Sequence, residues 1–332
     1  MAETFDDLLR QTARSFYLTL RVLPAAVRPQ IGLAYLLART TDTVADTALV
    51  SASRRLAALQ QLRERIRGTS AAPLDFGEFA QHQGSPAERV LLEQAETGLA
   101  ALAALSAADR ELVRTVLDII TTGQELDLQR FAGATEQNIA ALATAAELDD
   151  YTYRVAGCVG EFWTKLCRAH VFPRARLDDA ELLAQGIRFG KGLQLINVLR
   201  DLPGDLRQGR CYLPAPQLAE LGLTPADLLN PASEPRLRPL YQQWLEQAEA
   251  HLTAGWNYTN VLPWRCARVR LACAWPILIG AKTLARLRTA NVLEPAQRVK
   301  ISRSEVKGLM LRSVVCYPLP GVWRGLFAPQ AS

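Results

Sequence analysis

Apolar and small residues recur three and four positions apart along almost the whole chain, as between residues 8 and 20 and again between residues 56 and 66. This spacing is typical of amphipathic helices, and no long run shows the alternation of a strand. Proline and glycine divide the chain into helix-sized pieces, at 24–29, 68–86, 133–135, 173, 203–204 and 214–239. The pattern therefore predicts an all-α bundle of about ten helices.

The irregular stretches do not have the character of domain linkers. Residues 68–86 and 225–239 are neither long enough nor polar enough for that role, and no repeat of solenoid length is apparent. We therefore expect a single domain over residues 1–332. The first helix begins within residues 1–12, and residues 313–332 form a carboxy-terminal tail.

Composition narrows the class of protein. Apolar residues make up 49% of the chain and charged residues 21%, as in ordinary globular domains. The surplus of 38 Lys and Arg over 33 Asp and Glu is too small to indicate nucleic acid, although it suits anionic phosphates or lipids. Six cysteines without a C-x-x-C pair and three scattered histidines argue against a zinc cluster.

Location follows from the same survey. The beginning of the chain lacks the basic and apolar regions of a secretory signal, and the longest apolar run, residues 271–281, is about half the length of a spanning helix. We expect a cytoplasmic protein with reduced thiols. Its apolar tail leaves open a peripheral contact with the inner face of the membrane, although packing of Trp323 and Phe327 on the bundle is favoured.

Two pairs of aspartates carry the candidate chemistry. Asp42 and Asp46 are four residues apart, as are Asp201 and Asp205, and this spacing puts both carboxylates of a pair on one helix face. Like charges repel there unless a cation lies between them. Carboxylate oxygens suit Mg²⁺, which substrate phosphate oxygens complete, so the spacing indicates ionisation of a diphosphate ester. On spacing alone, a solvated helix face is an equal alternative.

The residues around the two pairs favour the binding site over the solvated face. They add guanidinium groups, a hydroxyl, an amide and aromatic rings, the mixture that a diphosphate pocket needs. These neighbours are Arg14, Ser15, Phe16, Tyr35, Arg39, Asn197 and Arg200.

At this point the chain resembles the head-to-head prenyl synthases, the family of squalene, dehydrosqualene and phytoene synthases. The matching stretches occur in family order and span most of the chain: residues 13–16, 35–46, 151–160, 192–205 and 209–214. The resemblance implies an isoprenoid synthase fold, an all-α bundle with a central active-site cavity and both aspartate motifs at its mouth.

The resemblance also implies a role for each matching position. Asp42, Asp46, Asp201 and Asp205 would bind Mg²⁺ with help from Asn197, and Tyr151 would be the catalytic tyrosine near the proton loss. Contacts to the substrate diphosphate would come from Arg14, Ser15, Phe16, Tyr35, Arg39, Gln194, Asn197 and Arg200. Since Pro203 disfavours helical geometry at Leu202, we expect Asp205 to lie on a kink and to be a less secure ligand than Asp201.

The last third of the chain bears on which reaction is catalysed. Residues 273–276 and 298–310 resemble the squalene-forming members of the family, which implies a reductive second step with NADPH. Lys300 and Arg303 would then meet the cofactor phosphates, a solvated face being the alternative. The Gly190-Lys-Gly192 segment is not a dinucleotide loop, because its third glycine and the preceding strand are missing.

The resulting expectation is a farnesyl-diphosphate farnesyltransferase. It would join two farnesyl diphosphates through presqualene diphosphate and reduce the product to squalene. A non-reductive member making presqualene diphosphate, dehydrosqualene or phytoene is the alternative, and an inactive assembly factor of the same fold is a more distant one. We expect a monomer.

Overall fold

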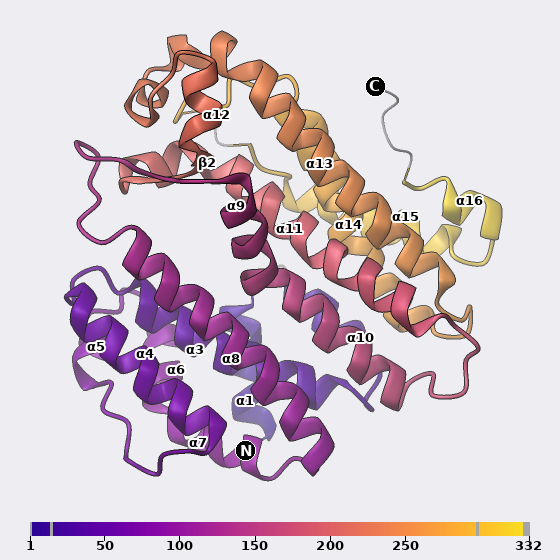
Figure 1. Ribbon diagram of the computed structural model, residues 1–332. Helices are drawn as coiled ribbons and strands as arrows, with labels where there is room; N and C mark the ends of the chain where they lie inside the picture. Colours follow the sequence, from indigo (N-terminus) through magenta and orange to yellow (C-terminus); the bar gives the residue numbers. More distant parts are fainter. Residues whose placement is uncertain (1, 14–15, 297–298, 328–332) are drawn as a thin grey trace. The chain divides into compact units, whose positions relative to one another are not determined.

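The computed structural model describes residues 2–13, 16–296 and 299–327. Most of these residues are helical, which confirms the predicted all-α class (Figure 1). The chain forms two compact units. Unit 1 contains the residues up to Gln129 together with Phe162–Arg174, and unit 2 contains Arg130–Glu161 and the residues from Ala175 onward. Whether one domain spans residues 1–332 stays a prediction.

Unit 1 is built around α3 (Arg28–Asp46). Pro29 lies in the first turn of this helix, where a missing N–H costs nothing, and the apolar face includes the buried Ile31, Leu37 and Val44. That face packs against α4, α6 and α7. The other helices of unit 1 are α1 (Ala2–Thr12), α2 (Phe16–Val22), α4 (Ala52–Arg67), α5 (Gly77–Gln81), α6 (Pro86–Glu93), α7 (Ala95–Ala103), α8 (Ala107–Arg130) and most of α10 (Cys158–His170).

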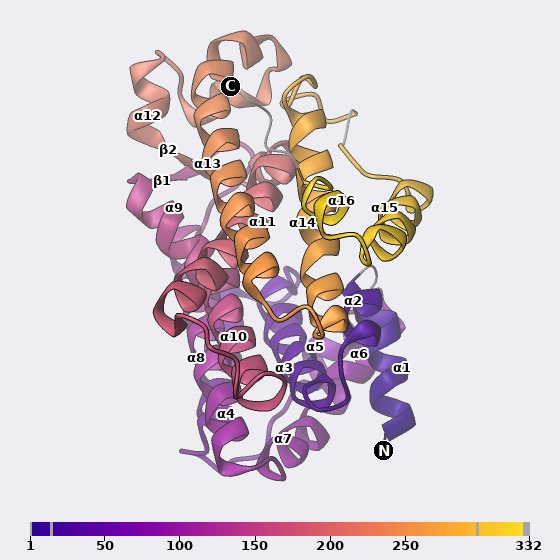
Figure 2. The ribbon, with the colours of Figure 1, turned by 90° about the vertical axis from the view of Figure 1, so that its right-hand side faces the viewer.

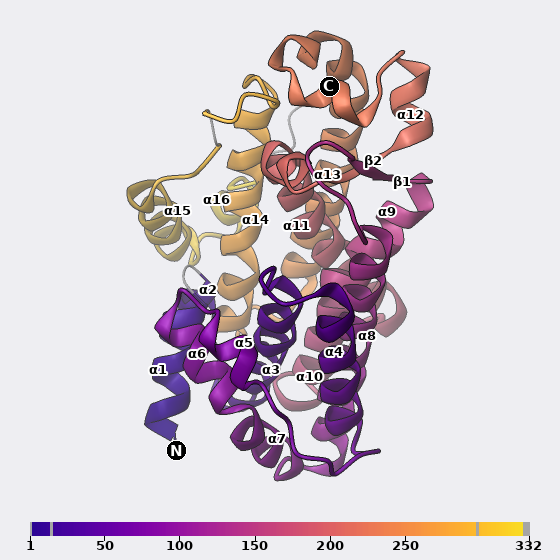
Figure 3. The same ribbon diagram turned by 90° about the vertical axis from the view of Figure 1, so that its left-hand side faces the viewer.

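A second layer of unit 1 joins α4 to α8, which lie side by side in Figure 3. Arg63 of α4 donates from Nε to Oδ1 of Asp118 at 2.7 Å and from Nη1 to Oε2 of Glu125 at 3.3 Å. Beneath this polar link, Leu59, Leu62 and other apolar side chains of α4 are fully buried.

Unit 2 is organised by α11 (Asp179–Arg207), which lies between α9 and α13 in Figure 1. Tyr241 of α13 is buried and donates its hydroxyl to the Leu199 carbonyl oxygen at 3.0 Å. The other helices of unit 2 are α9 (Ala145–Thr152), the π-helical turn η1 (Tyr153–Gly157), α12 (Ala215–Glu220), η2 (Pro225–Leu229), η3 (Pro231–Ser233), α13 (Glu234–Val261), α14 (Ala267–Leu287), α15 (Arg303–Cys316) and α16 (Pro320–Arg324).

Two short strands, which the hydrophobic pattern did not reveal, also belong to unit 2. Strand β1 (Ala140–Leu142) pairs in parallel with β2 (Arg210–Pro214), with Ala140 opposite Arg210. The pairing holds the segment before α9 against the segment after α11. It therefore helps to fix the distance between these two helices.

Glycines let the backbone of α11 contact the backbone at the end of η1 and at the start of α10. A Cβ on Gly190 would lie 2.0 Å from the Ala156 carbonyl oxygen, and one on Gly160 would lie 1.9 Å from the Gly186 carbonyl oxygen. Such separations are far below van der Waals contact, so only glycine fits at either position.

Helix α11 continues through Pro203 as far as Arg207, contrary to the expectation that Leu202 would leave helical geometry. Proline removes one hydrogen-bond donor from the helix. Leu202 and Leu206, each only 1% exposed, hold the last turns in the core and offset that loss. Asp205 consequently stays on the helix, one turn beyond Asp201.

Among the described residues, none of the helices combines the length and the apolar character needed to cross a bilayer.

Replacing Gly190 by alanine tests the backbone contact in unit 2. Because the added methyl group meets the Ala156 carbonyl, Gly190→Ala should lower the free energy of unfolding by about 1–3 kcal/mol in urea titrations followed by circular dichroism. Gly204, in the same helix, has no atom within 4 Å of an added Cβ, so Gly204→Ala should be neutral or stabilising by up to about 1 kcal/mol. Equal stability of the two variants would contradict the close approach.

Candidate functional site

The acidic face of α3 in unit 1 contains a guanidinium shared between two carboxylates. Arg39 donates from Nη1 to Oδ2 of Asp42, three residues further along the helix, and from Nη2 to Oε1 of Glu88 on α6. Asp46 ends the helix and is exposed. The structure thus brings together three predicted residues, and it adds Glu88, which the sequence motif does not contain.

The surroundings of Asp42 disfavour the ionised form of its carboxyl group. Desolvation by the surrounding protein, followed by the negative charge of Asp46, raises its pKa from 3.8 to about 6. Arg39 opposes this rise, and Glu88 adds to it. With 40% of the Asp42 side chain exposed, a dissolved cation can still reach it. A divalent cation beside Asp42 and Asp46 would remove the repulsion that raises the pKa.

Tyr35 lies one turn before Arg39 on α3. Its hydroxyl donates to the Thr12 carbonyl oxygen at 3.1 Å, which ties α3 to the end of α1. The predicted diphosphate contacts Arg14 and Ser15 follow Thr12 closely in the chain but lie outside the described residues. Phe16 begins α2, and its side chain also lies outside the described part of the structure.

In unit 2, a hydrogen-bonded chain of side chains joins α11 to the predicted catalytic tyrosine. Asn197 donates from Nδ2 to Oε1 of Gln194 at 3.3 Å, and Gln194 donates from Nε2 to the Tyr151 hydroxyl at 3.4 Å. Both donor groups lie on α11, whereas Tyr151 lies near the end of α9. The three residues were predicted separately, and the structure brings them together.

Aromatic rings hold Tyr151 from the other side. Its ring stacks on that of Tyr212 in β2, with centroids 4.5 Å apart and an angle of 28° between the planes. Phe131 contacts Tyr212 edge-on at 5.3 Å. Neither Tyr212 nor Phe131 was predicted as a site residue, although Tyr212 belongs to the matching stretch at 209–214.

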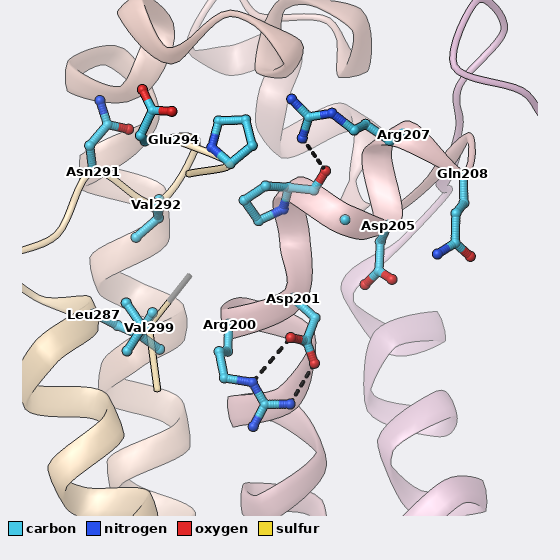
Figure 4. Close-up of a pocket in the computed structure, with 13 residues that line it drawn as sticks. Arg200, Asp201, Asp205, Arg207, Gln208, Leu287, Asn291, Val292, Glu294 and Val299 are labelled. Carbon is cyan, nitrogen blue, oxygen red and sulfur yellow. Dashed lines mark hydrogen bonds and ion pairs between the residues drawn. The ribbon is translucent and has the colours of Figure 1, made fainter. Parts of the chain in front are cut away.

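The second aspartate pair lies further along α11. Arg200 binds its neighbour Asp201 with two hydrogen bonds, from Nε to Oδ1 at 3.1 Å and from Nη2 to Oδ2. Asp205 lies one turn beyond Asp201 (Figure 4). Both acids line a pocket of about 410 Å³, together with Arg200, Arg207 and residues from the end of α14 and the segment after it. A phosphate group at this pocket would compete with Asp201 for Arg200.

The predicted cofactor residues lie beyond this pocket in sequence. Lys300 and Arg303 are both exposed. The Lys300 carbonyl oxygen accepts a hydrogen bond from Arg286, and Arg303 begins α15. Val299, which precedes Lys300, lines the pocket with Asp201. The role of Lys300 and Arg303 in binding NADPH stays a prediction.

The two aspartate pairs have the oxygen ligands that Mg²⁺ takes from proteins. Mg²⁺ is usually bound through one or two carboxylates, with waters and substrate phosphates completing the octahedron. Within the described part of the chain, no group of three or more His, Cys, Asp or Glu side chains converges on one metal position. Each pair alone supplies the one or two carboxylates that Mg²⁺ usually takes from a protein. The raised pKa of Asp42 indicates that Arg39 offsets the negative charge of this face only in part.

A helical protein with paired aspartates on long helices has the characteristics of an isoprenoid synthase, and comparison with known proteins identifies the family. The model of the squalene/phytoene synthase family matches residues 9–305. The chain belongs to this family.

The relatives of the chain differ in activity. A bifunctional lycopene cyclase/phytoene synthase of Gibberella fujikuroi is 30% identical over 73% of this chain, and the match spans about two-fifths of that longer relative. A presqualene diphosphate synthase of Rhodopseudomonas palustris is 29% identical over 91% of this chain and 93% of its own length. The squalene synthase of Schizosaccharomyces pombe is 25% identical over 93% of this chain and 64% of its own length.

Solved structures support the fold. A ligand-bound squalene synthase designated TcSQS superposes with a TM-score of 0.76 at 20% sequence identity, covering 98% of this chain and 96% of its own. This likeness confirms the predicted isoprenoid synthase architecture.

The shifted pKa of Asp42 gives a pH-dependence that can be measured. Because its pKa is raised above the unfolded value of 3.8, ionising Asp42 costs stability, and the free energy of unfolding should fall as the pH rises from about 4 to 6. Asp42→Asn should remove that part of the slope. In carbon NMR titrations, Asp46→Asn should lower the pKa of Asp42 and Arg39→Gln should raise it. An Asp42 carboxyl that titrates near 4 in the wild-type protein would show that neither desolvation nor the neighbouring acids raise its pKa.

Proposed function

We propose that the protein joins two farnesyl diphosphates head to head, forms presqualene diphosphate with release of one diphosphate, and reduces it with NADPH to squalene with release of the second. The crowded carboxylates of α3 carry the proposal. Asp42 has a raised pKa and remains accessible, an arrangement suited to an acid that works with a cation rather than alone. The family match supplies the prenyl diphosphate as the substrate class.

Binding of the diphosphate would use the residues around the two acid pairs. Asp42, Asp46, Asp201 and Asp205 would hold Mg²⁺, with Asn197 supporting the second pair. Bound there, Mg²⁺ supplies positive charge that stabilises the departing diphosphate. Arg39 and Arg200 would turn from Asp42 and Asp201 towards phosphate oxygens, which guanidinium groups bind well in paired geometry.

Tyr151 would act close to the carbocation. Gln194 donates a hydrogen bond to the Tyr151 oxygen, so the hydroxyl proton is directed away from Gln194. The stacked rings of Tyr151 and Tyr212 offer π-electron density that stabilises a nearby cation. We propose that Tyr151 directs the proton lost during cyclopropane formation, with the released diphosphate as its acceptor.

A non-reductive reaction is the second candidate. Its support is the presqualene diphosphate synthase relative, which matches this chain over almost its full length. Such an enzyme would use the same aspartates for the first ionisation and would stop at presqualene diphosphate, dehydrosqualene or phytoene. The inactive assembly factor is disfavoured because both aspartate pairs are retained.

Product analysis separates the candidates. Purified protein with farnesyl diphosphate and Mg²⁺ should give squalene only when NADPH is added, as measured by mass spectrometry of extracted lipids. Presqualene diphosphate or dehydrosqualene that is unchanged by NADPH would assign the non-reductive reaction and leave the aspartate sites in place.

Two variants control that experiment. Asp42→Asn should lower diphosphate release by at least about a hundredfold, since the leaving group loses its charge stabilisation. Asp75→Asn changes an exposed aspartate two residues before α5 and should leave the rate unchanged. Near-normal diphosphate release by Asp42→Asn would refute the metal assignment.

A further inference from the structure

Exposed apolar side chains gather on one part of unit 2. Ten large hydrophobic residues are exposed in the described part of the chain, and seven of them belong to only two segments. Leu311 and Val315 are each 66% exposed, far more than a core residue. We call this set the apolar face; it consists of Val261, Trp264, Leu311, Val314, Val315, Leu319 and Val322.

Aromatic contacts hold the two segments together as one surface. The rings of Trp264 and Tyr317 stack with centroids 4.4 Å apart, and the Tyr317 hydroxyl donates to the Trp264 carbonyl oxygen. Trp323 packs edge-on against both rings, at 6.4 Å and 4.9 Å. The buried Arg270 lies over the Trp264 ring at 4.6 Å and donates to the Leu262 carbonyl oxygen at 2.7 Å. These contacts therefore hold the two segments of the apolar face in fixed positions.

Core packing does not account for the apolar face, because other residues of the same segments already serve the core. Trp275 of α14 donates to the buried hydroxyl of Ser313 at 2.9 Å, which fixes the inner side of α15. Trp323 and Phe327 are buried and pack on Trp256, which confirms that these two tail residues pack on the bundle. In its second half α15 thus exposes Leu311, Val314 and Val315, whereas surface helices normally present polar residues to solvent.

Figures 2 and 3 show α15 at the edge of unit 2, with no other described element of that unit outside it. Gathered exposed apolar side chains are typical of a surface that contacts a protein or a membrane.

The charge around the apolar face identifies the partner. Residues 261–270 and 306–327 contain six Arg or Lys and no Asp or Glu. Arg265, Lys307, Arg312 and Arg324 are exposed beside the apolar side chains. A second copy of the chain would bring these like charges together, whereas anionic lipid headgroups would attract them. The partly exposed Trp264 is also a residue type favoured at the boundary between headgroups and acyl chains.

We propose that the apolar face docks onto an anionic phospholipid membrane. Leu311, Val314, Val315, Leu319 and Val322 would enter the outer acyl region, while the surrounding cations bind headgroup phosphates. This inference does not depend on the proposed reaction, because binding to lipid is measured without substrate.

Vesicle flotation tests the proposal with the full chain. The protein should float with vesicles of phosphatidylcholine and phosphatidylglycerol, and much less with phosphatidylcholine alone. The triple variant Leu311→Gln, Val314→Gln, Val315→Gln should bind the anionic vesicles at least about tenfold more weakly. Arg312→Ser and Arg324→Ser should each weaken that binding by about fivefold, and by less at high salt.

Matched controls change the same residue types elsewhere. Leu49→Gln replaces a leucine of unit 1 that is 77% exposed, and Arg176→Ser replaces an exposed arginine of unit 2; neither should alter flotation. Equal urea midpoints would show that the variants fold. Absence of wild-type binding to anionic vesicles would overturn the proposal, as would equal binding by the triple variant and Leu49→Gln. A dimer that the triple variant disrupts without changing flotation would identify a second copy as the occupant and would also overturn it.

Discussion

The backbone contact between α11 and residues 156–160 is the constraint on which the unit 2 site depends. Gly190 allows the two segments to touch, since any side chain there would collide with the Ala156 carbonyl. Gln194, Asn197 and Asp201 follow Gly190 at spacings of four, seven and eleven residues, which is one face of a helix. The same contact therefore carries these residues along the side of α11 that meets α9, where Gln194 reaches Tyr151.

Unit 1 contributes a different property, an unfavourable concentration of negative charge. Asp42 is ionised at neutral pH at a cost in stability, because desolvation and Asp46 both oppose its charge. Buried apolar residues on the opposite side of α3 offset that cost. Arg39 compensates the acids only in part, since its guanidinium is divided between Asp42 and Glu88. A divalent cation would stabilise such a face by offsetting the repulsion between its acids. The same cation would stabilise the departing diphosphate in the proposed reaction.

The sequence predicted what depends on local spacing and missed what depends on distant contacts. Helical periodicity gave the all-α class, and the four-residue spacing correctly placed Asp201 and Asp205 on one helix. Glu88 could not be recognised, because only the packing of α6 beside α3 brings it to Arg39. Tyr212 could not be recognised for the same reason, since it contacts Tyr151 only because β1 pairs with β2. At Pro203 the local rule failed because burial of neighbouring leucines outweighed one missing hydrogen bond.

Proton release on binding of Mg²⁺ and inorganic diphosphate tests the central claim, that the Asp42 carboxylate is a metal ligand whose pKa the protein has raised. Calorimetric titrations at pH 6 in buffers of different ionisation enthalpy measure this release, and Asp42→Asn corrects for protons lost by diphosphate itself. With a pKa of about 6, the wild-type protein should release about half a proton more than the variant. Equal proton release, with equal affinity for the metal and diphosphate, would contradict the claim.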